Sequence, residues 1–128
     1  MRDRSEADDI VQGAYNRALL DLILPAMRRA AKDAGYSLAV HGSLNRDIDL
    51  IAVPWTEHGV WTPDALVDAL CGAARGQVGR CNKFKEEWTI KPHGRLARTL
   101  LAWVGENTAS IDLSVMPRIE KEKTDETD

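Results

Sequence analysis

The chain has 128 residues, of which 44% are hydrophobic and 29% charged, a composition that excludes a disordered chain and two ordinary domains. Its net charge of −3 excludes a protein that binds nucleic acid through overall positive charge. No apolar run approaches the roughly 20 residues of a membrane-spanning helix, so no membrane partner is expected. Residues 1–9 are acidic and lack the apolar segment of a signal peptide. We therefore expect a cytoplasmic protein, in which Cys71 and Cys81 stay reduced.

The first third of the chain is predicted to form a helix followed by two strands. Apolar residues recur at helical spacing over residues 9–34, where Pro25 either kinks one long helix or begins a second one. Gly35 suits the left-handed residue that closes a helix. Two short apolar runs, Tyr36–His41 and Asp47–Val53, are typical of strands.

A second helix is predicted to begin after Thr62. The Thr62 hydroxyl suits an N-cap, and Pro63 suits the first helical position, where proline has no hydrogen bond to lose. Gly72 is expected to stop this helix. Residues 72–83 contain three glycines and are predicted to form a mobile loop.

The remaining chain is predicted to form strands and a tail. Lys85–Ile90, Arg95–Val104 and Ser110–Met116 are candidate strands, and a Gly-Glu-Asn turn between the last two indicates an antiparallel hairpin. This order predicts an α+β fold, with helices packed on one mixed β-sheet in a single domain over residues 1–117. Residues 118–128 are charged, nearly free of apolar side chains, and predicted to be a disordered tail.

Three aspartates in strand-like surroundings are the candidate catalytic and metal-binding residues. Asp47 and Asp49 alternate with apolar residues, so both side chains project to the same side of a strand. Asp112 has similar apolar neighbours and is expected on an adjacent strand. Clustered carboxylates ionise together beside a cation, and hard oxygen ligands suit Mg²⁺ or Mn²⁺. The alternative is that Asp47 only opens a strand and Asp112 faces solvent beside the hairpin.

The Gly42-Ser43 pair lies just before these acids and is a candidate nucleotide-binding element. Glycine after a strand allows the backbone to approach a phosphate closely, and the serine hydroxyl and nearby amides are able to bind phosphate oxygens.

A basic stretch follows the second predicted helix. Residues 71–98 hold seven Lys and Arg side chains against two glutamates. Within this stretch Lys91, His93 and Arg95 lie between two predicted strands, and we predict that they contact nucleotide phosphates. The alternative is an exposed turn whose basic residues aid solubility.

Histidine and tryptophan supply further candidate contacts to a nucleotide. His41 precedes the Gly-Ser pair at a strand end, where bonding to a backbone group is the commoner role. Tryptophan stacks well on bases, although packing in the core or at an edge is its commoner role. The tryptophans are Trp55, Trp61, Trp88 and Trp103.

Taken together, these motifs resemble the nucleotidyltransferase fold of the DNA polymerase beta superfamily. The resemblance rests on Gly42-Ser43 after a strand, Asp47 and Asp49 on the next strand, and the later Asp112. It implies that the Gly-Ser pair holds a triphosphate, that the first two aspartates bind metal ions, and that the last helps to activate the attacking hydroxyl. Three residues separate the Gly-Ser pair from the first aspartate, fewer than is usual in the family. The chain is also similar to small proteins of bacteria and their prophages.

The resemblance implies Mg²⁺-dependent transfer of a nucleoside monophosphate from a nucleoside triphosphate to a hydroxyl acceptor on a protein or nucleic acid. The alternative is a non-catalytic nucleotide-binding or protein-interaction module, antitoxin-like or regulatory, which the short connection favours. A metal-dependent nuclease that uses the three aspartates with Glu87 and Lys91 is a weaker alternative, because it leaves the Gly-Ser pair without a role.

Overall fold

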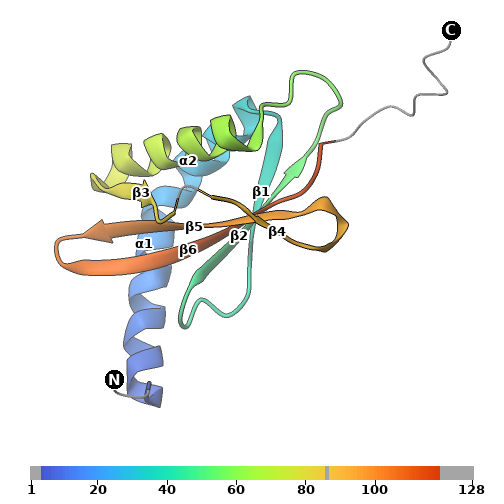
Figure 1. The fold of residues 1–128 in the computed structure, drawn as a ribbon. Coiled ribbons are helices and arrows are strands. Elements are labelled where there is room, and N and C mark those ends of the chain that lie inside the picture. The colour runs from blue at the N-terminus through green and yellow to red at the C-terminus, as the bar shows by residue number, and fades with distance from the viewer. Residues whose placement is uncertain (1–3, 86, 119–128) are drawn as a thin grey trace, which may run out of the picture.

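The computed structural model describes residues 4–85 and 87–118, which form two helices and one six-stranded sheet (Figure 1). The predicted single-domain α+β fold with a mixed sheet is confirmed. Apart from Arg118, the predicted tail lies outside the described residues.

Helix α1 spans Glu6–Asp33 as one element. Its N-terminus is closed by a capping box, in which the Ser5 hydroxyl accepts from the Asp8 amide and the Asp8 carboxylate accepts from the Ser5 amide. The helix continues through Pro25, so no second helix begins there. Pro25 and Asp21 are exposed, and the Asp21 carbonyl that lacks its usual helical donor is therefore on the solvent side.

Strand β1 spans Tyr36–His41, as predicted. Strand β2 spans Ile48–Pro54, so it is shifted by one residue from the prediction and Asp47 lies just before it. The two strands are antiparallel, and Gly35 takes the predicted left-handed conformation before β1, with φ +95°.

Helix α2 spans Pro63–Val78, and the Thr62 hydroxyl accepts from the Ala65 amide as its N-cap. The predicted stop at Gly72 is wrong, because the helix continues until Gly79, which supplies the left-handed C-cap at φ +91°. Much of the predicted mobile loop is therefore helical.

Of the strand predicted over Lys85–Ile90, only the end is a strand among the described residues, and a further short strand forms within the predicted mobile loop. Strand β3 spans Cys81–Lys83 and strand β4 spans Thr89–Ile90, and both pair with the same neighbour. Between them, the Lys85 carbonyl accepts two hydrogen bonds from the buried Arg98 side chain. A 3-10 turn at Pro92–Gly94 follows β4.

Strands β5 (Leu96–Val104) and β6 (Asn107–Val115) form the predicted antiparallel hairpin. The order of strands across the sheet is β1-β2-β6-β5-β3, with β4 also paired to β5. Strand β6 lies between β5 and β2 and runs parallel to β2, which makes the sheet mixed. Two strands that are distant in the sequence thereby become neighbours at the centre of the sheet.

Both helices cover the same face of the sheet and pack against each other (Figure 1). One hydrophobic core fills the space between the helices and the sheet, with Cys71 and Cys81 buried in it as free thiols. Its largest fully buried side chains include Tyr36, Leu19, Ile23, Met27, Ile48, Leu50, Leu66, Leu70, Leu100, Ile111 and Leu113. Neither helix of the described residues has the length and hydrophobicity needed to cross a membrane. The opposite face of the sheet is left for polar side chains.

Candidate functional site

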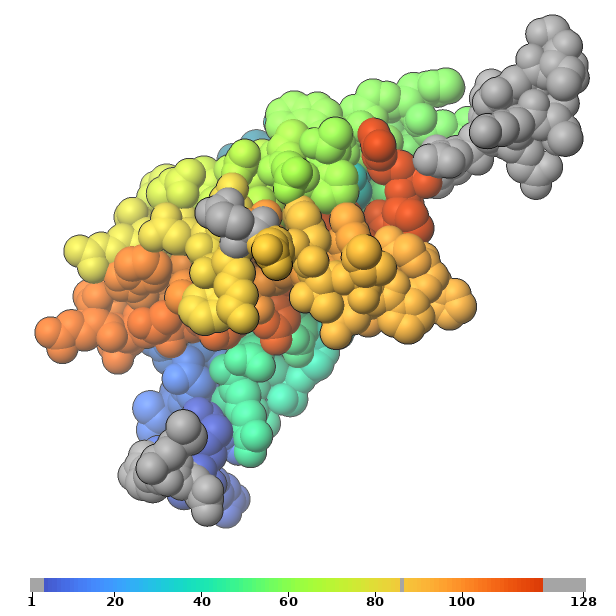
Figure 2. All heavy atoms as spheres, viewed as in Figure 1, coloured from blue at the N-terminus to red at the C-terminus, as the bar shows by residue number. Residues whose placement is uncertain are grey.

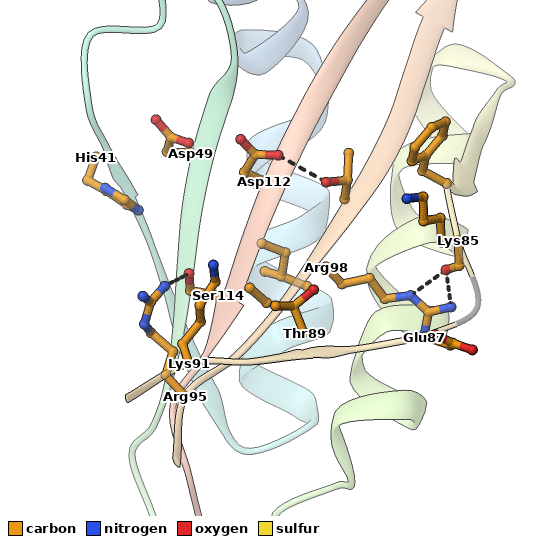
Figure 3. A pocket seen from close by; sticks show the side chains of 14 residues that line it. His41, Asp49, Lys85, Glu87, Thr89, Lys91, Arg95, Arg98, Asp112 and Ser114 are labelled. Atoms are coloured by element: carbon orange, nitrogen blue, oxygen red, sulfur yellow. Dashed lines mark hydrogen bonds between the residues drawn. The ribbon is translucent and has the colours of Figure 1, made fainter. Parts of the chain in front are cut away.

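A row of polar side chains crosses the face of the sheet that the helices leave open. In the sheet register His41 faces Asp49, Asp49 faces Asp112, and Asp112 faces Thr99. Residues that face each other on adjacent strands project from the same side of a sheet, with backbones about 4.8 Å apart. The fold thus places Asp49 and Asp112 side by side on the parallel central strands, as Figure 3 shows.

The two aspartates of this row line a pocket of about 470 Å³, a volume suited to a small-molecule ligand. On the side of the pocket away from β1, the lining residues come from β5 and from the described residues between β3 and β4, which are coloured yellow to orange in Figure 2. The Thr99 hydroxyl donates to Oδ1 of Asp112 over 3.1 Å, which fixes the orientation of that carboxylate. Other lining side chains belong to His41, Phe84, Lys85, Glu87, Thr89, Lys91, Arg95, Arg98 and Ser114.

The carboxylates in and beside this row repel one another. Burial raises the pKa of Asp49 above its ordinary value, and the charge of Asp112 raises it further, against the opposing effect of His41. Burial also raises the pKa of Asp47, with added contributions from Asp112 and Asp49. Asp47 lies just before β2 and is half-buried, within electrostatic reach of the other two acids. A bound cation would relieve this repulsion.

Gly42 packs directly against the carboxylate of Asp49. Its φ is +78°, and a Cβ added at this position would lie 2.6 Å from Oδ2 of Asp49. A glycine is favoured at position 42 for two reasons: the left-handed backbone strains other residues, and a side chain there would push the Asp49 carboxylate aside. This contact links the Gly-Ser pair to the aspartates in space as well as in sequence.

The loop that carries Ser43 is held by helix α1. The buried Asn16 side chain donates to the Leu44 carbonyl over 2.8 Å, and Arg17 donates to the Ser43 carbonyl over 3.1 Å. The Ser43 hydroxyl accepts from the Asn45 amide within the loop. The short connection between β1 and β2 is thus anchored to the helix and positions Gly42 beside the acids.

Replacing Gly42 by Ala is expected to destabilise the protein by more than the roughly 1–2 kcal/mol of a left-handed alanine. The excess arises because the new methyl group displaces the Asp49 carboxylate. Gly59→Ala is the matched control, because Gly59 has φ +73° and its Cβ would meet no described atom within 4 Å. Urea unfolding of both variants gives the comparison, and equal losses would show that the Gly42–Asp49 contact is unimportant.

Of the three basic residues predicted to contact phosphates, Arg95 and Lys91 line the pocket. Arg95 donates to the Ser114 hydroxyl over 2.8 Å, and Ser114 follows Asp112 by two residues on the same face of β6 (Figure 3). Among the described residues, His93 is not part of the pocket lining and lies exposed in the 3-10 turn, with φ +66°. Gly42, Ser43 and Asp47 are not among the described residues that line the pocket.

The basic stretch predicted over residues 71–98 is divided by the fold. Lys85 and Arg98 line the pocket with the two cations described above. Lys83 instead forms an ion pair with Asp68 on helix α2, at 3.1 Å. Arg75 bonds to the Cys81 carbonyl and Arg80 lies over the Trp103 ring, so neither is part of the pocket lining.

The aromatic residue in the pocket is Phe84, which the sequence reasoning missed, and not a tryptophan. Among the described residues, none of the four tryptophans lines this pocket. Trp88 donates its indole N–H to Asp64 and lies over Arg98. Cys81 is buried and Asn82 exposed, as in a strand, but this alternation is a feature of the folded structure. In the sequence, the glycines just before Cys81 suggested a loop.

The chemistry of the acids suits a magnesium ion. Mg²⁺ binds oxygen ligands and typically takes one or two protein carboxylates, with water and substrate phosphates in the other positions. Asp49 and Asp112 supply two such carboxylates in register, and Asp47 adds negative charge beside them. Within residues 4–85 and 87–118, no group of three carboxylate, imidazole or thiol side chains is arranged to hold a metal ion without further ligands. The arrangement fits an ion that is shared with a phosphate substrate.

No protein-family model matches the chain, and no curated protein shows a significant match to its sequence. The residues of the pocket and their geometry therefore indicate the function.

Proposed function

We propose that the protein is a Mg²⁺-dependent nucleotidyltransferase, which transfers a nucleoside monophosphate from a nucleoside triphosphate to a hydroxyl group of a protein or nucleic acid. The observation that carries this proposal is the facing pair Asp49 and Asp112 on parallel central strands, beside a pocket that also contains cations. Acids bind the metal ion and cations bind the phosphates, so the two kinds of charge together suit a metal-bound polyphosphate.

Asp49 and Asp112 would hold Mg²⁺, with Asp47 adding charge from the edge of the pocket. A bound magnesium ion supplies neutralisation of phosphate charge and alignment of the reacting oxygens. Gly42, just after β1, leaves room for the Asp49 carboxylate, because a side chain at this position would displace it.

The basic residues on the same face are suited to the triphosphate. Arg95 is positioned by its hydrogen bond to Ser114, and Lys91 lies beside it at the pocket (Figure 3). Arginine binds phosphate through a fork of N–H donors, whereas lysine acts as a mobile point charge. Both would stabilise the negative charge that accumulates on the departing pyrophosphate.

In the proposed reaction the acceptor oxygen bonds to the α-phosphorus, and the bond from that phosphorus to the pyrophosphate oxygen breaks. Asp112 accepts the proton of the attacking hydroxyl, and the hydrogen bond from Thr99 keeps its carboxylate oriented for this transfer. The products are the nucleotidylated acceptor and pyrophosphate.

Nucleotide binding tests the proposal without knowledge of the acceptor. In calorimetry, a nucleoside triphosphate is expected to bind in the presence of Mg²⁺, and Arg95→Gln is expected to weaken binding by roughly 10- to 150-fold. This loss corresponds to about 1.5–3 kcal/mol for a hydrogen bond to a charged group. Arg29→Gln makes the same charge change on an exposed position of helix α1 and is expected to leave the affinity unchanged. An absence of binding at millimolar nucleotide would overturn the proposal in favour of an interaction module.

A further inference from the structure

Phe84 lies next to Thr99, at the end of the row of polar side chains that crosses the open face of the sheet. Its amide donates to the Thr99 carbonyl over 2.9 Å, which continues the pairing of β3 with β5 beyond Lys83. Facing residues of antiparallel strands share a side of the sheet, so the Phe84 side chain projects on the same side as Thr99 and Asp112. Phe84 accordingly lines the pocket that contains the acids.

The Phe84 ring is exposed, although its backbone is firmly held. Phe84 is the single phenylalanine of the chain, and it is 55% exposed. Its own amide is bonded to Thr99, and the carbonyl of the next residue, Lys85, accepts two hydrogen bonds from the buried Arg98 (Figure 3). Isolated exposed apolar residues are common on protein surfaces. An exposed aromatic ring on a hydrogen-bonded backbone at the wall of a polar pocket is a different case.

The spacing between Phe84 and the acids matches the dimensions of a nucleotide. Phe84 lies two strand intervals from Asp112, or about 10 Å between backbones. A nucleotide whose α-phosphate lies at the acids has its ribose over Thr99 and its base at the ring. Its triphosphate then extends along the strands toward Arg95, away from the ring.

We propose that Phe84 is the stacking platform for the nucleobase in this pocket, an inference that rests on the proposed nucleotidyltransferase function. The Lys85 ammonium lies 5.7 Å from the centre of the ring, and such an exposed contact is weak enough for an entering base to displace. Every base offers a π face, so stacking of this kind accepts any of them. The site is therefore expected to bind all four nucleoside triphosphates.

Comparison of a nucleoside triphosphate with inorganic tripolyphosphate isolates the contribution of the base. In calorimetry with Mg²⁺, Phe84→Ala and Phe84→Leu are expected to bind ATP, GTP, CTP and UTP about 5- to 100-fold more weakly than the wild type. Both variants are expected to bind tripolyphosphate within about twofold of the wild type. Phe84→Tyr keeps an aromatic ring and is expected to retain wild-type affinity for the nucleotides.

Trp55→Ala is the matched control, because Trp55 is similarly exposed, at 54%, and lies outside this pocket. It is expected to leave every affinity unchanged. Wild-type nucleotide affinity in Phe84→Ala, or retention of affinity in Phe84→Leu, would overturn the stacking role alone. Equal losses for tripolyphosphate and nucleotide would also overturn it. Failure of the wild type to bind any nucleotide would overturn the proposed function and this inference with it.

Discussion

Replacement of Asp49 by Asn is expected to abolish the stabilisation of the protein by Mg²⁺. An ion that binds only the folded state stabilises it by mass action, by about 1.4 kcal/mol when its concentration is ten times the dissociation constant. The Asn variant lacks one of the two facing carboxylates, and Asp112 with only the added charge of Asp47 is expected to hold the ion too weakly. The measurement is the melting temperature with Mg²⁺ and with a chelator, for the wild type and the variant.

Asp21→Asn is the control for this experiment, because it removes the same charge from an exposed position of helix α1. It is expected to keep the full response to Mg²⁺. An equal response in Asp49→Asn and the wild type would show that the facing acids are not a metal site. The same loss is expected in Mg²⁺-dependent nucleotide binding, since the phosphates are held partly through the ion.

In the presence of the chelator, without bound Mg²⁺, the Asp49→Asn variant is expected to be more stable than the wild type at pH 7. Burial and the charge of Asp112 raise the pKa of Asp49 in the folded state, so folding favours its protonated form. This contribution to stability is fully present below the unfolded pKa, near 3.8, and is lost as the pH rises through the raised folded value. The advantage of the Asn variant therefore shrinks as the pH falls toward 3.8, which unfolding by urea at several pH values measures. A constant difference across this range would contradict the assignment.

Replacement of Arg98 by Ala is expected to have the largest effect on folding, a loss of about 2–4 kcal/mol in the free energy of unfolding. The Arg98 side chain is buried and donates two hydrogen bonds to the Lys85 carbonyl, and its guanidinium lies 5.4 Å from the Trp88 ring centre. Its ion pair with Asp64, at 3.7 Å, adds little because Asp64 is largely exposed. Urea unfolding measures the loss.

Arg80→Ala provides the comparison, since Arg80 also lies over a tryptophan ring but is exposed. Its effect is expected to stay within about 0.5 kcal/mol. A similarly small effect of Arg98→Ala would show that the connection between β3 and β4 is held without this side chain. Arg98→Lys keeps the charge and loses the fork of donors, so it is expected to recover only part of the stability.

Local residue patterns were sufficient to predict most of the secondary structure. The Thr62 cap, the left-handed Gly35 and the apolar runs of β1 and β2 depend on neighbours only a few residues away. The same local logic failed at Gly72, because the position of a helix end depends on where a left-handed cap is available, and Gly79 provides it. It failed again at Cys81–Lys83, where the glycines of the preceding segment suggested a loop but β3 forms.

The candidate site was predictable only in part, because local patterns do not specify which distant strands become neighbours. Alternation along a strand indicated that Asp47 and Asp49 share a side, and the apolar neighbours of Asp112 indicated a second strand. The pocket also contains Phe84 and Arg98, which carry no motif of their own. Their importance comes from the strands beside them, which no local pattern specifies.

The sequence by itself determined the residue types available for chemistry, the α+β class and the strands that carry the acids, because these follow from composition and short-range periodicity. The tertiary structure alone decided that Asp49 faces Asp112, that Gly42 packs against Asp49, and that Phe84 and Arg95 lie on the same open face. Register between distant strands depends on burying one common set of apolar side chains beneath two helices. That condition involves the whole core at once, and only the folded chain satisfies it.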